Sequence, residues 1–79
     1  SYGRYGPVLP SETLWSIATK LRPSPAITMD QVLLAIYRGN PQAFEGGING
    51  LLKGATLSVP SAEDMSRVDA VGAHAEVSA

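Results

Sequence analysis

The acidic side chains that could act in catalysis within the first 60 residues are Glu12, Asp30 and Glu45. Glu12 and Asp30 stand where helices are expected to begin, and a carboxylate there interacts favourably with the helix dipole. Glu45 falls in a loop. Hydrolysis of a glycan needs two carboxylates at a defined separation, one of them with a raised pKa. A segment of this length has no room for the deep cleft that such a pair requires, so we expect no enzymatic activity.

The residue types give no support for a metal or cofactor site. The chain has one histidine, His74, and no cysteine, so neither a disulfide nor a thiolate metal site can form. His74 lies among small residues with no second ligand nearby, and we interpret it as a solvated side chain. The glycine-rich loop does not follow a strand and open a helix, as a phosphate-binding loop would. We expect no metal and no cofactor.

The composition indicates one small domain. The 79 residues carry a net charge of −1, which divides into +2 over residues 1–60 and −3 over residues 61–79. A chain of this length forms a single domain. The basic side chains are scattered, which argues against nucleic-acid binding. No apolar run approaches the roughly 18 residues of a membrane span, and no charged-then-apolar leader opens the chain, so we expect these residues to make no membrane contact.

The elements that must position the polar side chains begin with a strand and a helix. Residues 5–9 are predicted to form a short edge strand, where the missing N–H of Pro7 does no harm. Ser11 is the expected N-cap of the first helix, and Pro23 ends that helix. Its apolar stripe, at positions i, i+3, i+4 and i+7, consists of Leu14, Ile17, Ala18 and Leu21.

A second helix and a second strand follow. Thr28 and Gln31 form a capping-box pattern at the start of the helix, and Gly39 is placed to be its C′ residue. The apolar stripe of this helix consists of Met29, Val32, Leu33 and Ile36. The loop to residue 53 is long, but its apolar residues suggest that it packs against the domain. Residues 56–59 alternate as a strand that is expected to pair antiparallel with the first.

These elements predict an α+β fold of order βααβ, with two helices packed on one face of a two-stranded antiparallel sheet. We expect an N-terminal arm over residues 1–4, the domain over residues 5–60 and a linker over residues 61–79. The linker is acidic and has no aromatic residue. Because it buries too little apolar surface to offset the entropy of ordering, we predict that it is disordered. A short helix near residues 62–71 is the alternative.

Two stretches of the chain carry a resemblance to a known family. They are residues 10–18, Pro-Ser-Glu-Thr-Leu-Trp-Ser-Ile-Ala, and residues 54–60, Gly-Ala-Thr-Leu-Ser-Val-Pro. Together with the Asn40-Pro41 pair between them, they resemble a LysM domain, which is a carbohydrate-binding module. Two departures from the family pattern stand out: Ser11-Glu12 replaces the usual Gly-Asp, and the loop between Asn40 and Leu51 is longer.

With its longer loop, the chain is similar to one particular group of LysM modules. Residues 5–8, 21–23, 37–44 and 47–49 resemble the periplasmic module of the FimV/HubP family. Members of that family are large inner-membrane proteins that mark bacterial cell poles and support type IV pilus function and twitching motility. The resemblance covers about residues 5–60. It implies a periplasmic domain, followed by a linker and a transmembrane anchor in the parent protein.

The resemblance also implies a ligand and a site. LysM modules hold glycan chains containing N-acetylglucosamine, such as those of peptidoglycan, in a shallow groove between the loop before the first helix and the loop after the second. The corresponding residues here are Ser11, Glu12, Thr13, Leu14, Asn40, Pro41, Ile48 and Leu51. Five of them have a structural alternative. Ser11 and Glu12 could cap a helix, Thr13 could hydrogen-bond its own backbone, Leu14 belongs to the buried stripe, and Asn40 could simply end a helix. Trp15 could stack on a sugar ring or pack at a half-exposed edge, and the same choice holds for Tyr37.

The function implied is non-catalytic binding of peptidoglycan glycan strands, which would anchor a polar scaffold protein to the cell wall. The alternative is a protein-interaction module that docks onto pilus-assembly or secretion components, favoured by Ser11-Glu12 and by the apolar long loop. A third interpretation is a self-associating domain, although we expect the isolated domain to be a monomer.

Overall fold

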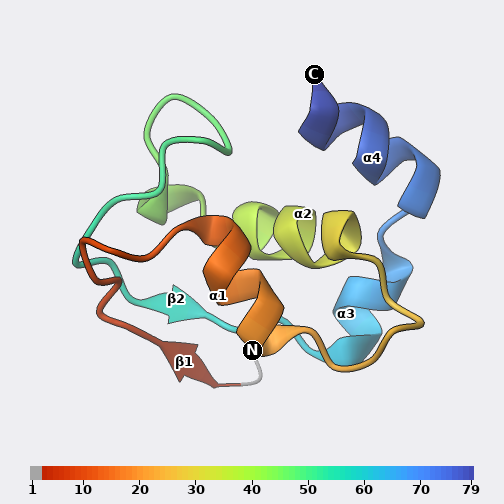
Figure 1. Cartoon of the computed structure of the whole chain (residues 1–79), viewed down its shortest axis with the longest axis horizontal. Helices are drawn as coiled ribbons and strands as arrows, with labels where there is room; N and C mark the ends of the chain where they lie inside the picture. The colour runs from red at the N-terminus through yellow and green to blue at the C-terminus, as the bar shows by residue number, and fades with distance from the viewer. Residues whose placement is uncertain (1–2) are drawn as a thin grey trace.

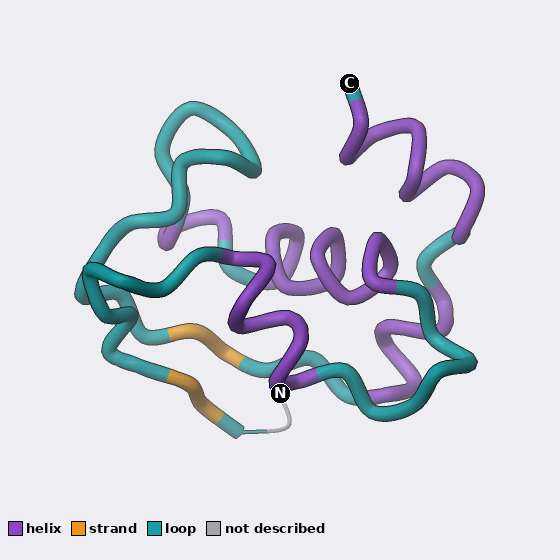
Figure 2. The backbone as a smooth tube through the Cα atoms, viewed as in Figure 1, coloured by secondary structure: helices purple, strands orange, loops and turns teal. Residues whose placement is uncertain are grey.

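The computed structural model describes residues 3–79 and has an α+β architecture (Figures 1 and 2). A two-stranded sheet lies on one side of the molecule, and four α-helices and a short 3-10 helix form the rest. In chain order the elements are β1 (Arg4–Tyr5), α1 (Leu14–Leu21), α2 (Met29–Gly39), the 3-10 helix η1 (Pro41–Ala43), β2 (Leu57–Ser58), α3 (Ala62–Arg67) and α4 (Ala70–Ser78). The α+β class is as predicted, and two further helices follow the second strand.

The sheet joins the two strands antiparallel, as predicted, with Arg4 opposite Ser58 and Tyr5 opposite Leu57. Both strands are shorter than predicted. Beyond β1, the Val8 N–H donates to the Ala55 carbonyl oxygen at 2.9 Å and the Gly54 N–H donates to the Val8 carbonyl oxygen at 2.7 Å, outside the regular ladder. A Cβ atom on Gly6 would lie 2.8 Å from the Ala55 carbonyl oxygen, so the two backbones touch there. Of the predicted arm over residues 1–4, residues 1 and 2 lie outside the described residues, whereas residues 3 and 4 bond to the second strand.

Helix α1 begins two residues later than predicted. Its N-cap is Thr13, in an extended conformation, and Ser11 lies in the preceding turn. The Thr13 Oγ1 atom accepts from the Ser16 backbone N–H at 3.1 Å, and the Ser16 Oγ atom accepts from the Thr13 N–H at 3.0 Å. Because Ser16 reciprocates the cap, Thr13 forms a complete capping box and Ser11 is not needed. The buried stripe of Ile17 and Ala18 is as predicted.

Helix α2 lies at the centre of the molecule (Figure 1). The predicted capping box of Thr28 and Gln31 is confirmed, with bonds of 3.1 and 2.8 Å. Residues 31–36 are all buried, because α2 packs against α1, α3, α4, η1 and β2. Its C-terminus differs from the prediction: Gly39 is the last helical residue and Asn40 is the C-cap.

The tail after residue 60 is helical, so the prediction of disorder is wrong. Ser61 and Asp69 cap α3 and α4, and the Gln31 side chain donates a hydrogen bond of 2.8 Å to the Val68 carbonyl oxygen. Met65 and Ala73 are buried, at 2% and 1% exposed. The tail has too little apolar surface to fold by itself, but it packs against the apolar surface of α2.

The hydrophobic core gathers side chains from the segment before α1 and from α1, α2, η1, β2 and α3. It consists of Val8, Ile17, Ala18, Ile27, Val32, Leu33, Ala35, Ile36, Ala43, Leu57 and Met65. Over residues 3–79, none of the helices combines the length and the hydrophobicity needed to cross a membrane.

Candidate functional site

A groove of about 380 Å³ lies between the start of α1, the hairpin after η1 and the end of α4. We call it the groove, and we call residues 44–51 the hairpin. The first wall of the groove consists of Thr13, Leu14 and Trp15, and the second of Ile48, Asn49 and Leu51. Three further residues complete the lining: Leu33 from α2, Lys53 after the hairpin and Val77 from α4.

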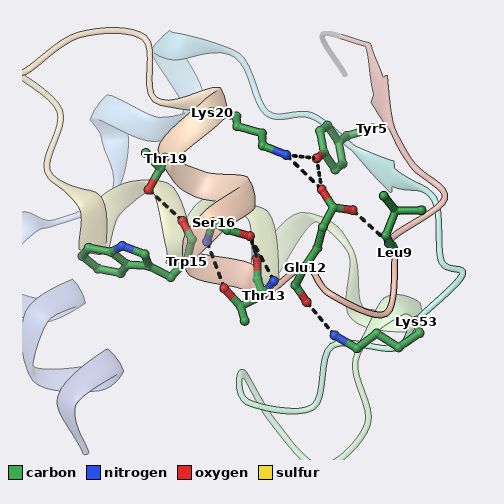
Figure 3. Close-up of polar contacts among 9 residues, drawn as sticks. All are labelled: Tyr5, Leu9, Glu12, Thr13, Trp15, Ser16, Thr19, Lys20 and Lys53. Carbon is green, nitrogen blue, oxygen red and sulfur yellow. Dashed lines mark hydrogen bonds and ion pairs between the residues drawn. The ribbon is translucent and has the colours of Figure 1, made fainter.

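The first wall is the N-terminal turn of α1. The backbone of Thr13 is held by its capping box, so its hydroxyl group keeps a constant position at the edge of the groove. Leu14 is half-buried, whereas Trp15 is 58% exposed. Figure 3 shows the Trp15 indole on the opposite side of α1 from Glu12 and Lys20. An exposed indole in a groove offers a flat apolar face with one polar N–H.

The second wall is the hairpin, which is ordered by its own backbone. Phe44 and Leu51 form an antiparallel bridge, and the Glu45 N–H donates to the Gly50 carbonyl oxygen at 2.9 Å. A Cβ atom on Gly50 would lie 1.7 Å from the Glu45 carbonyl oxygen, so only glycine fits this turn. The Phe44 ring meets Tyr37 of α2 edge to face, with centroids 4.9 Å apart. The long loop therefore packs down, as its apolar residues predicted.

A cluster around Glu12 holds the turn before α1 in place (Figure 3). The Glu12 carboxylate is buried and accepts hydrogen bonds from the Tyr5 hydroxyl, from the Leu9 N–H at 2.8 Å and from Lys20 Nζ at 3.1 Å. The Lys20 ammonium also lies 5.7 Å from the Tyr5 ring centroid. With the carboxylate fully engaged, Glu12 shapes the backbone beside the groove and its side chain does not line it.

The same contacts shift the pKa values of both charged groups. The Tyr5 hydrogen bond, followed by those from Leu9 and Lys20, lowers the pKa of Glu12 from 4.5 to about 2, against the opposing effect of desolvation. Hydrogen bonds to Tyr5 and Glu12 raise the pKa of Lys20. The pair is therefore charged at neutral pH. A carboxylate with so low a pKa is a poor general acid.

Asn40 does not line the groove, and its side chain stabilises the fold instead. It is fully buried, its Nδ2 group donates to the carbonyl oxygens of Ile36 and Ser58 at 2.9 Å, and its Oδ1 atom accepts from the Ser58 N–H at 2.7 Å. These bonds attach the end of α2 to β2. Pro41 is exposed at the start of η1, outside the groove.

The structure thus brings together four of the eight predicted site residues, Thr13, Leu14, Ile48 and Leu51, and leaves Ser11, Glu12, Asn40 and Pro41 outside the groove. Sequence reasoning did not include Leu33, Asn49, Lys53 and Val77, and it weighed Trp15 as an alternative. The position of Asn49 beside Ile48 was a usable signal. No sequence signal pointed to Val77, because the tail was predicted to be disordered.

His74 and the acidic side chains outside the Glu12 cluster are the remaining candidates for a metal site. The His74 side chain is exposed, as predicted, and its Nδ1 atom lies 2.8 Å from the Asp30 Oδ2 atom, which links α4 to α2. Between residues 3 and 79, no cluster of three or more histidine or acidic side chains is arranged to hold a metal ion. Comparison with protein-family models, with curated proteins and with solved structures finds no match.

Proposed function

We propose that this chain is a non-catalytic glycan-binding domain with a LysM-type βααβ core, and that its ligand is the N-acetylglucosamine-containing strand of peptidoglycan. The groove carries this proposal. It combines a hydroxyl, a carboxamide and an ammonium group with an exposed indole and aliphatic side chains within one shallow space. The resemblance of residues 10–18 and 54–60 to LysM supports the same ligand.

The chemistry of the groove suits an acetylated amino sugar. An acetamido group needs hydrogen-bond partners for its carbonyl and N–H and a small apolar pocket for its methyl group. Thr13, Asn49 and Lys53 offer polar groups, and Leu14 and Ile48 offer apolar surface beside them. A shallow groove buries little of a ligand, so one domain binds weakly and useful affinity comes from several copies on one wall.

The single tryptophan of the chain makes a direct test available. Trp15 lines the groove, so its fluorescence should change as a soluble N-acetylglucosamine tetrasaccharide is added. Amide chemical shifts should change at residues 13–15 and 48–53 in the same titration. If neither signal responds at millimolar ligand, the proposal is wrong.

A protein-interaction module remains the second candidate. Three large apolar side chains within residues 3–60 are exposed, Leu9 at 54%, Trp15 at 58% and Leu52 at 40%. Of these, Trp15 lies in the groove, where its indole could also contact an apolar side chain of a protein partner. Sedimentation with purified, protein-free cell-wall sacculi separates the two candidates, because only a glycan-binding domain should sediment with them.

The proposal extends to the parent protein through the resemblance alone. We propose a periplasmic position, with the domain anchoring an inner-membrane scaffold of the FimV/HubP type to the cell wall at the cell pole. Such a scaffold would support type IV pilus assembly and twitching motility. Deleting residues 5–60 from the parent should then abolish polar retention of the protein and leave its expression unchanged.

A further inference from the structure

Helix α4 contributes to the groove although it lies outside the segment that resembles LysM. Val77, near its C-terminal end, shares the groove lining with Trp15 and Leu33. Val77 is half-buried and packs against the core, so its side chain faces inward. In contrast, Val71 of the same helix is 80% exposed and does not line the groove.

The position of α4 is held by several independent contacts with α2. Ala73 is 1% exposed. His74 lies 2.8 Å from Asp30, and Arg38 Nη2 lies 3.2 Å from Glu76 Oε1. The two polar contacts reach opposite ends of α2, at Asp30 and Arg38, and together with Ala73 they hold one turn of α4, next to Val77, against α2. Exposed ion pairs are individually weak, and the buried Ala73 face contributes most of the docking.

We infer that α4 is a wall of the binding site and that Val77 and Trp15 hold one sugar ring between them. The inference rests on the proposed glycan binding. A pyranose ring has apolar C–H faces, which pack well on an indole and on an aliphatic side chain, while its hydroxyl groups stay near water. Trp15 supplies the flat surface from α1, and Val77 supplies the aliphatic contact from α4. The binding unit therefore extends to residue 77.

Matched substitutions in α4 test this inference in the full chain. Val77→Ala should weaken binding of the N-acetylglucosamine tetrasaccharide by about three- to tenfold, because it removes apolar contact area from the ligand. Val71→Ala makes the same chemical change in the same helix and should leave affinity unchanged. Trp15→Ala should weaken binding by about tenfold or more. Circular dichroism of each variant confirms that the fold is retained.

One measurement made without ligand keeps the outcomes separate. In the free protein, nuclear Overhauser contacts between the Val77 and Leu33 methyl groups should be present, and they should be lost in Ala73→Glu, which forces α4 off α2. If the wild-type chain binds the tetrasaccharide but Val77→Ala and Ala73→Glu bind equally well, α4 is not part of the site and the inference falls while the proposed function stands. If the wild-type chain does not bind the sugar, the proposed function fails, and this inference fails with it.

Discussion

Lys53 donates a hydrogen bond of 2.5 Å from its Nζ atom to the backbone carbonyl oxygen of Glu12. The bond joins the chain leaving the hairpin to the residue before the N-cap of α1, so it links the two walls of the groove (Figure 3). Its donor is a side chain that also lines the groove. Lys53 therefore contributes to the spacing of the two walls and also brings a positive charge to the groove.

Lys53→Met should loosen this link. We expect the free energy of unfolding to fall by about 0.5–1.5 kcal/mol, which is typical for the loss of one hydrogen bond. Affinity for the tetrasaccharide should fall as well, because the walls lose their fixed spacing. Urea unfolding and the fluorescence titration measure the two effects.

The control is Arg67→Met, which removes exposed ion pairs of 3.3 Å and should change stability by less than about 0.5 kcal/mol. Equal effects of the two variants would contradict the role given to Lys53.

Two asparagines should separate structure from binding. Asn40→Ala leaves the Ser58 N–H and two carbonyl oxygens without their buried partner, and it should cost about 2–4 kcal/mol of stability. Asn49→Ala changes an exposed groove residue and should alter stability by no more than about 0.5 kcal/mol while weakening sugar binding. Thermal unfolding and titration of both variants check this. Retained stability in Asn40→Ala would show that its three bonds contribute little.

The Glu12 cluster should make stability depend on acid pH. Because the pKa of Glu12 is lowered from 4.5 to about 2 in the folded chain, its contribution is complete above pH 4.5 and is lost as pH falls toward 2. Urea unfolding should show this decline in the wild type, and Glu12→Gln should flatten it. Tyr5→Phe removes the largest cause, so a carboxyl carbon NMR titration should place the Glu12 pKa closer to 4.5. An unchanged titration would mean that Tyr5 does not hold the carboxylate.

Two glycines should respond oppositely to alanine. Gly50→Ala places a Cβ atom 1.7 Å from the Glu45 carbonyl oxygen, so the hairpin must open, and we expect a loss of about 2 kcal/mol or more. Gly39 is an exposed helical position with free space around it, and Gly39→Ala should raise stability by about 0.5–1 kcal/mol. Chemical denaturation measures both. A neutral Gly50→Ala would show that the hairpin is not closed as described.

Docking of the tail should be measurable through Met65. Met65 is 2% exposed, so Met65→Ala should cost about 2–5 kcal/mol. Val71→Ala, at a position that is 80% exposed, should change stability by less than about 0.5 kcal/mol. A disordered tail would instead make both substitutions neutral in thermal unfolding, which would support the original expectation from composition.

The features that sequence reasoning predicted well are local and periodic. The capping box of Thr28 and Gln31 and the buried stripe of α1 both follow from spacing along one helix. The N-cap of α1 was misplaced at Ser11, although Ser16 stands three residues after Thr13 and completes a capping box there. Leu14 occupies the same position relative to Ser11 and cannot reciprocate a cap, so the local pattern did hold a usable signal.

The features that were missed depend on contacts between distant segments. Met65 and Val77 are apolar residues in a tail of mostly small residues, and their burial depends on a face of α2 that is distant in the sequence. Asn40 ends a helix in the sequence, and only the position of β2 shows that its side chain is fully occupied. The sequence therefore predicted residues from both walls of the groove, but it did not predict the contributions of Leu33 from α2 and Val77 from α4.

The enclosure of α2 has a consequence for how this protein could diverge. Residues 31–36 touch neighbours on every side, so a change there must be accommodated by both ends of the chain at once. Trp15 and Asn49, in contrast, are exposed, one on α1 and the other in the hairpin. Substitutions at these two positions can therefore change the surface of the groove without repacking the scaffold beneath it.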